Sequence, residues 1–223
     1  MALLAFRYGA FRALRNLSAG LLLLGGAAQA ETVMIAALGD SLTAGYGLTP
    51  ETGFVSQLQA WLDEAGADAT VINAAVSGDT TAGGLSRVAW SLTPEVDAMI
   101  VALGGNDYLR AIDPAVAKEN LQGVIDIGIE AGVEILLIGI EVGSNYGSEY
   151  KIAFDDMYPS LAKENDIKLF ENWFKGLRDE TVNQSEFTRY LQRDGLHPNA
   201  EGVSLIVEAM GPAVLDLISL VDK

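Results

Sequence analysis

A serine, a histidine and an aspartate in this chain have the types and spacing that nucleophilic catalysis requires. His197 is the only histidine of the 223 residues, so a mechanism that uses an imidazole at neutral pH must use it. Asp194 precedes it by three residues, in a turn that Gly195 makes and Pro198 stops, so its carboxylate could hold one ring nitrogen and set the tautomer. Ser41 would need such a base within hydrogen-bond reach. These three residues are the candidate catalytic set.

Two further residues could stabilise negative charge on a reacting carbonyl oxygen. Gly78 has no side chain and can present its backbone N–H openly, and Asn106 can donate from its side-chain amide. Together with the N–H of Ser41 they would form an oxyanion hole. Each residue also has an ordinary structural interpretation, because glycine makes turns, asparagine makes Asx turns and serine caps helices. Only the combination favours catalysis.

The elements that must position these residues alternate along the chain. Short apolar runs rich in β-branched residues are followed by longer helical patterns, which predicts βαβ units around a parallel sheet. The runs are nearly continuous in apolar character, as expected for strands with helices on both faces. We therefore predict one three-layer α/β/α domain with a five-stranded, mostly parallel sheet. The expected strands are 33–38, 69–73, 99–103, 134–140 and 167–170.

The expected helices lie between and after these strands. They cover residues 54–65, 81–91, 114–131, 146–165 with a break before Pro159, and about 199–221. Ligands of parallel α/β sheets bind beyond the carboxyl ends of the strands, so the loops after the first three strands and the loop before the last helix could converge on one rim. The segment 171–193 has no clear period and is long for a connection, so it is either functional or a local excursion.

Four separated blocks resemble the GDSL lipases and esterases, also called SGNH hydrolases. They are GDSL at 39–42, GDT at 78–80, GGND at 104–107 and DGLHPN at 194–199. Within the family the resemblance is closest to the bacterial periplasmic thioesterases, lysophospholipases and arylesterases. It implies a flavodoxin-like SGNH hydrolase fold and no cofactor or metal.

The resemblance also implies roles for individual residues. Ser41 is the nucleophile of an acyl-enzyme mechanism, Asp194 and His197 complete the catalytic set, and Ser41, Gly78 and Asn106 form the oxyanion hole. Asp40 and Asp107 would hold the blocks together by hydrogen bonds. The segment 171–190 looks longer and more charged than its counterpart in the family, so acyl-chain preference does not carry over. Its aromatic side chains could cover an acyl chain, although core packing is the commoner role.

The first 30 residues predict a signal peptide. Three arginines precede an uncharged apolar run over residues 17–28, which leads into Ala28-Gln29-Ala30. A membrane anchor is the alternative, but the run is shorter than the ~20 apolar residues that span a bilayer. We expect cleavage after Ala30, a periplasmic or secreted hydrolase domain over 31–223, and no stable membrane anchor after cleavage.

The composition of the chain limits the classes of partner that we expect. Loss of residues 1–30 removes three of the 14 Lys and Arg residues and none of the 30 acids, so the net charge changes from −16 to −19. Such a surface repels nucleic acid and anionic membranes. The chain has no cysteine, which excludes thiol chemistry and disulfides. We expect a monomer that acts on a small-molecule ester, thioester or lysolipid.

Two other functions stay open as alternatives. A metal-dependent phosphoesterase would need metal ligands, for which the candidates are Asp40, Asn106, Asp107, Asp194 and His197. Two-metal phosphatase sites generally draw on several histidines, which disfavours this alternative. A non-catalytic periplasmic binding protein could hold an anion in the same glycine-rich loops. It would have no reason to place a serine, a histidine and an oxyanion pair on one rim.

Overall fold

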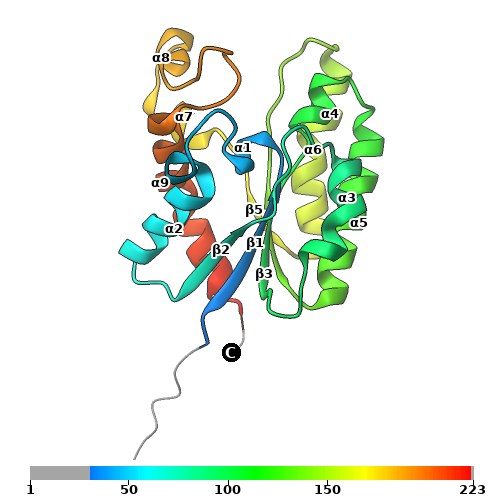
Figure 1. Ribbon diagram of the computed structural model, residues 1–223. Coiled ribbons are helices and arrows are strands. Elements are labelled where there is room, and N and C mark those ends of the chain that lie inside the picture. The colour runs from blue at the N-terminus through cyan, green and yellow to red at the C-terminus, as the bar shows by residue number, and fades with distance from the viewer. Residues whose placement is uncertain (1–30, 222–223) are drawn as a thin grey trace, which may run out of the picture.

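A five-stranded sheet runs through the middle of the computed structural model, which describes residues 31–221 (Figure 1). The predicted signal peptide therefore lies outside the described residues. In chain order the strands are β1 (Val33–Gly39), β2 (Ala69–Asn73), β3 (Ala98–Ala102), β4 (Glu134–Ile138) and β5 (Lys168–Phe170). Their order across the sheet is β2-β1-β3-β4-β5, and each neighbouring pair is parallel. The predicted fold class is confirmed.

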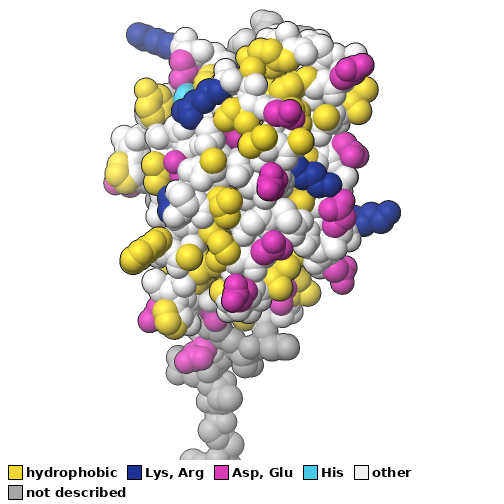
Figure 2. All heavy atoms as spheres, turned by 90° about the vertical axis from the view of Figure 1, so that its right-hand side faces the viewer, with side chains coloured by type: hydrophobic (Ala, Val, Ile, Leu, Met, Phe, Trp, Pro, Cys, Tyr) yellow, Lys and Arg dark blue, Asp and Glu magenta, His cyan; other side chains and the backbone are white. Residues whose placement is uncertain are grey.

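Helices cover both faces of the sheet (Figure 1). One layer contains α1 (Ser41–Ala44), α2 (Phe54–Glu64), α7 (Lys175–Glu180), α8 (Gln184–Arg189) and α9 (Ala200–Ile218), with a short 3₁₀ turn over Pro50–Thr52. The opposite layer contains α3 (Thr81–Ser91), α4 (Gly105–Leu109), α5 (Pro114–Ala131) and α6 (Ser148–Asn165). Acidic side chains are spread over the face that Figure 2 shows, in keeping with the net charge.

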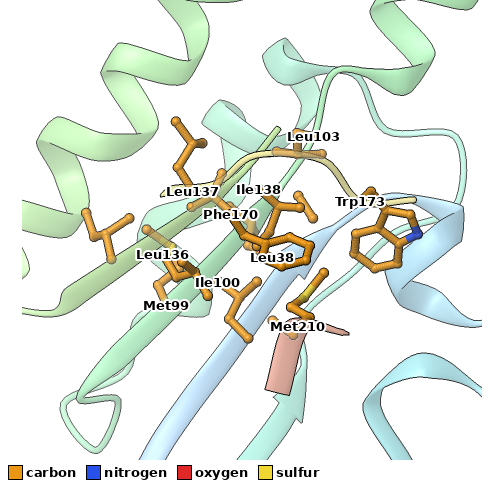
Figure 3. Packing of buried hydrophobic residues seen from close by; sticks show 14 of the residues in the cluster. Leu38, Met99, Ile100, Leu103, Leu136, Leu137, Ile138, Phe170, Trp173 and Met210 are labelled. Carbon is orange, nitrogen blue, oxygen red and sulfur yellow. The ribbon is translucent and has the colours of Figure 1, made fainter. Parts of the chain in front are cut away.

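The core lies on the central strands and the helices packed against them. Ile100 of β3 and Leu136 of β4 have no exposed surface, and the close view shows them among side chains of the neighbouring strands, such as Leu38 of β1 and Phe170 of β5 (Figure 3). Met210 of α9, a helix that packs against the sheet, belongs to the same cluster. Burial on both faces explains why these strands read as unbroken apolar runs rather than as alternating patterns.

Helix α6 differs from its prediction. It starts at Ser148 and continues through Pro159 to Asn165, so the expected break before Pro159 is wrong. A proline inside a helix costs about 3 kcal/mol because it removes a hydrogen bond and crowds the preceding turn. The residues beside it offset this cost: Leu161 is fully buried, and the buried Tyr158 hydroxyl donates to the carbonyl of Leu103 at 3.0 Å.

The segment 171–193, which had no clear period, contains two short helices, α7 and α8. Trp173 is only 1% exposed and Leu177 is fully buried, so both belong to the core, as expected for most apolar residues of this segment. Short helices leave too few turns for a period to stand out from the sequence. Within residues 31–221, none of the helices combines the length and the apolar character that crossing a bilayer requires.

Candidate active site

Ser41 begins helix α1 directly beyond the carboxyl end of β1. Asp40 caps this four-residue helix, because its Oδ1 accepts the backbone N–H of Leu42 at 3.0 Å. Gly39 must be a glycine, since a Cβ there would stand 2.2 Å from Oγ1 of the buried Thr43. The end of β1 and the cap together hold the Ser41 side chain at the rim of the sheet.

His197 lies between Ser41 and Asp194. Its Nε2 is 2.8 Å from the Oγ of Ser41, although the two residues are 156 positions apart. Its Nδ1 is 2.7 Å from Oδ2 of Asp194, the contact that the three-residue spacing predicts. A proton on Nδ1 would leave Nε2 free to accept from the Ser41 hydroxyl. The arrangement can therefore draw a proton from the serine.

The charge on Asp194 is stabilised within its own loop. Its Oδ1 accepts the backbone N–H groups of Leu196 at 2.9 Å and of His197 at 3.1 Å. The bond from Leu196, together with those from His197, lowers the pKa of the Asp194 carboxyl to about 2. Asp194 is therefore ionised at neutral pH and can stabilise a positive charge on the imidazole.

Asn106 stands at the start of α4, on the loop after β3. Its Nδ2 donates to Oδ2 of Asp40 at 3.2 Å, which links the loops after β1 and β3. Asp40 is only 2% exposed, and this burial raises its pKa to about 6. An amide nitrogen carries two protons, so Asn106 keeps a second donor for another acceptor.

Asp107 links α4 to the start of α3. It is fully buried and accepts from the backbone N–H of Thr81 at 2.8 Å and from its hydroxyl at 2.6 Å. Burial raises the pKa of Asp107, although the hydrogen bonds from Thr81 act to lower it. Asp40 and Asp107 thus connect separate sequence blocks through hydrogen bonds, the role that the family resemblance implies.

Gly78 sits in the loop between β2 and α3 with a φ of +87°, a conformation that suits glycine. Its carbonyl accepts Nη2 of Arg110 at 2.9 Å. Among residues 31–221, Gly78 is not one of those that line the cavity beside Ser41. Its role in the oxyanion hole therefore stays a prediction.

Arg87, which the sequence reasoning missed, holds this loop. Its Nη2 donates to the carbonyl of Gly39 at 3.0 Å and its Nη1 donates to the carbonyl of Ala74. Its Nε pairs with Asp79, the residue after Gly78, at 2.5 Å. One guanidinium therefore ties the Gly78 loop to the strand end that precedes Ser41. The sequence offered no signal for this role, because the partners of Arg87 lie 8, 13 and 48 positions away from it.

A cavity of about 190 Å³ opens beside Ser41 and His197. Its walls come mainly from apolar side chains of α1, of α4, of the loops after β4 and β5, and of the loop before α9. Phe174 belongs to the segment whose aromatic side chains the sequence allowed to cover an acyl chain, whereas the other apolar wall residues were not predicted: Leu42, Tyr108, Leu109, Ile140, Val142 and Leu196. Ile140 and Val142 follow β4, whose carboxyl end meets the same rim, so the rule that placed the other loops also applies here. The cavity can take an apolar group next to the serine.

The oxygen-bearing side chains of the site were also the candidate ligands of a phosphoesterase. Within the described part of the chain, no group of three or more His, Asp and Glu side chains is arranged to hold a metal ion. Asp40, Asp107 and Asp194 accept hydrogen bonds from protein N–H and O–H groups instead.

Comparison with known proteins agrees with the block pattern. The model of the GDSL-like Lipase/Acylhydrolase family matches residues 37–205. Esterase TesA of Pseudomonas aeruginosa is 35% identical over 199 residues, which cover 89% of this chain and 94% of that protein. Thioesterase 1/protease 1/lysophospholipase L1 of Escherichia coli is 34% identical over 194 residues, or 86% and 88% of the two chains. A crystal structure of TesA superposes with a TM-score of 0.74 at 34% identity, over 82% of this chain and 99% of that one.

Proposed function

The chain belongs to the GDSL-like lipase/acylhydrolase family, and on that premise we propose that it is an exported serine esterase that forms an acyl-enzyme on Ser41. It is a carboxylic ester hydrolase. The observation that carries the proposal is the hydrogen-bonded series from Ser41 through His197 to Asp194. A serine with a base at 2.8 Å, and a carboxylate behind that base, is the arrangement that activates a hydroxyl nucleophile.

The reaction has two steps. In the first, Nε2 of His197 takes the hydroxyl proton while Oγ of Ser41 attacks the acyl carbonyl. The tetrahedral intermediate collapses to the acyl-enzyme, and the leaving alcohol or thiol takes the proton from His197. In the second, a water molecule gives a proton to His197 and attacks the acyl-enzyme, which releases the acid and returns the proton to Ser41. Asp194 stabilises the imidazolium in both steps.

Three donors would stabilise the negative charge on the carbonyl oxygen. They are the N–H groups of Ser41 and Gly78 and the second amide proton of Asn106. The hydrogen bond from Asn106 to Asp40 supports this role, because it uses one amide proton and orients the other. Loss of one such donor typically costs about 10²- to 10³-fold in rate.

The substrate we propose is an aryl ester, a short- to medium-chain acyl ester or thioester, or a lysophospholipid. The apolar walls of the cavity next to Ser41 support an acyl chain as the group that enters it. The names of the relatives, esterase and thioesterase or lysophospholipase, belong to the same carbonyl chemistry. Export rests on the arginines and the apolar run of residues 1–30.

Covalent labelling tests the nucleophile. A fluorophosphonate probe should label the wild-type chain and not Ser41→Ala, while Ser185→Ala, at an exposed serine of α8, should label normally. Hydrolysis of p-nitrophenyl butyrate should follow the same pattern. Wild-type turnover by Ser41→Ala would contradict the assignment, and a folded wild-type chain that takes no label would favour the binding-protein alternative.

Substrate class and export need separate measurements. A chain-length series of p-nitrophenyl esters, run beside an acyl thioester and lysophosphatidylcholine, would rank the candidates by kcat/KM. For export, expression of the full chain in a bacterium should yield periplasmic or secreted protein whose first residue is Glu31. Full-length protein retained in the cytoplasm would contradict export and leave the esterase chemistry untouched.

A further inference from the structure

A closed ring of hydrogen bonds contains the contact between Ser41 and His197. Oγ of Ser41 meets Nε2 of His197 at 2.8 Å, and the carbonyl of His197 accepts the backbone N–H of Gln192 at 2.7 Å. The side chain of Gln192 donates to the carbonyl of Tyr46 at 2.7 Å. The N–H of Tyr46 donates to the carbonyl of Ser41 at 3.0 Å, which closes the ring. Four residues from two distant parts of the chain thus form one circuit.

The side-chain amide of Gln192 bridges the two loops of this circuit. Its Nε2 donates to the carbonyl of Tyr46 on the serine loop and, at 3.0 Å, to the carbonyl of Pro198 on the histidine loop. An amide nitrogen has two protons, so one is available for each loop. Gly47 makes room for the bridge, since a Cβ there would lie 2.1 Å from Oε1 of Gln192.

The bridge also places an aromatic ring against the imidazole. The ring centroids of Tyr46 and His197 lie 4.7 Å apart, with an angle of 38° between the planes. Gln192 holds the backbone from which this ring projects. Tyr46 therefore limits the rotation of the His197 ring on the side that it covers.

The elements that carry Ser41 and His197 need such support. Helix α1 has four residues, and the His197 loop has a single isolated pairing of strand type within the described chain, between Leu191 and Pro198. In reactions of this kind, a misplacement of about 1 Å can cost roughly 10²-fold in rate. Gln192 is not among the described residues that line the cavity, so it is placed to act on the loops rather than on the substrate.

We propose that Gln192 is a positioning residue of the esterase reaction, which sets the Ser41–His197 geometry by joining the two loops through one amide. This inference rests on the proposed function. It predicts a loss in the rate per intact site rather than in the number of folded molecules or in substrate binding.

The test is Gln192→Met, which keeps the length of the side chain and removes both donors. The matched control is Gln184→Met, at an exposed position of α8. Active sites are titrated with the fluorophosphonate at saturation, and kcat per titrated site, KM and the unfolding temperature are measured with p-nitrophenyl butyrate as substrate. We expect Gln192→Met to lose about 10- to 100-fold in kcat per site with KM changed less than about threefold, and the control to match the wild type.

A value of kcat per titrated site within about twofold of the wild type would overturn the inference, even if fewer sites were titrated. Should Gln192→Met not fold, Gln192→Asn is measured in the same way. Its amide is one methylene shorter and cannot reach both loops, so the same loss is expected and the same result would overturn it. A wild-type chain that takes no fluorophosphonate would contradict the proposed function itself, which separates the two failures.

Discussion

The side-chain amide of Asn106 donates to the buried carboxylate of Asp40 at 3.2 Å, across two loops that are 66 positions apart in sequence. The other oxygen of Asp40 caps the helix that begins with Ser41. One carboxylate therefore holds both the proposed nucleophile and a proposed oxyanion donor. Because it is buried, its protonation is coupled to folding.

Asp40→Asn should remove a pH dependence of stability. Burial raises the pKa of Asp40 from 3.8 to about 6, so the folded chain holds this proton more tightly than the unfolded chain. The stability from this group is therefore fully present below pH 3.8 and is lost as pH rises through about 6. Thermal unfolding across this range should show the wild type losing stability relative to Asp40→Asn. A difference in thermal stability between the two chains that stays constant across this pH range would contradict the prediction. The control is Asp216→Asn, at an exposed position of α9.

Asp194→Asn should slow the chemical step. The amide is neutral, so it cannot stabilise an imidazolium, and it can bind the imidazole in the wrong tautomer. We expect kcat per titrated site to fall by about 10²- to 10⁴-fold with little change in KM. Steady-state kinetics with active-site titration would measure this. A decrease of less than about tenfold would remove Asp194 from the catalytic set.

The Asp194 carboxyl should stay ionised far into acid. The N–H bonds from Leu196 and His197 lower its pKa from 3.8 to about 2. Stability from these bonds is thus present above pH 3.8 and is lost as pH falls through about 2. Carboxyl-detected NMR titration of the wild type and of Asp194→Asn would identify the resonance and its midpoint. A midpoint near 4 would show that the loop does not hold the carboxylate as described.

Arg87→Lys should loosen the Gly78 loop. The guanidinium meets Asp79 and the carbonyls of Gly39 and Ala74 together, whereas an ammonium group cannot reproduce this planar fork. If the N–H of Gly78 serves the oxyanion, kcat should fall toward the ~10²-fold that loss of one donor costs. Arg189→Lys, at an exposed ion pair with Glu201, should leave kcat unchanged. Equal kcat in both variants would contradict this prediction.

Phe174→Ala should shift acyl-chain preference toward longer chains. Phe174 lines the cavity, and its ring lies 6.1 Å from that of Phe187, so its removal opens space toward α8. Each additional buried methylene contributes about 0.8 kcal/mol, or roughly fourfold in kcat/KM. A p-nitrophenyl ester series from acetate to dodecanoate would measure the optimum. An unchanged optimum would mean that the acyl group lies elsewhere in the cavity.

The secondary structure was largely predictable because its signals are local. Helices α3 and α5 have the predicted bounds, and β2 does as well, since apolar periodicity and caps act over a few residues. Pro159 shows where such rules fail. A proline normally ends a helix, but the burial of Tyr158 and Leu161 stabilises the continuous form, and that packing depends on distant parts of the chain.

The sequence by itself determined which side chains were available to the site. One histidine is present, and an aspartate three residues before it can reach the ring without any distant contact. Only the tertiary structure decided that Ser41 lies 2.8 Å from this histidine, and that Arg87 and Gln192 hold the loops around them. The reason is physical, because these contacts join loops that follow different elements. The distance between the two partners of each contact is set by how strands and helices pack along the whole sheet.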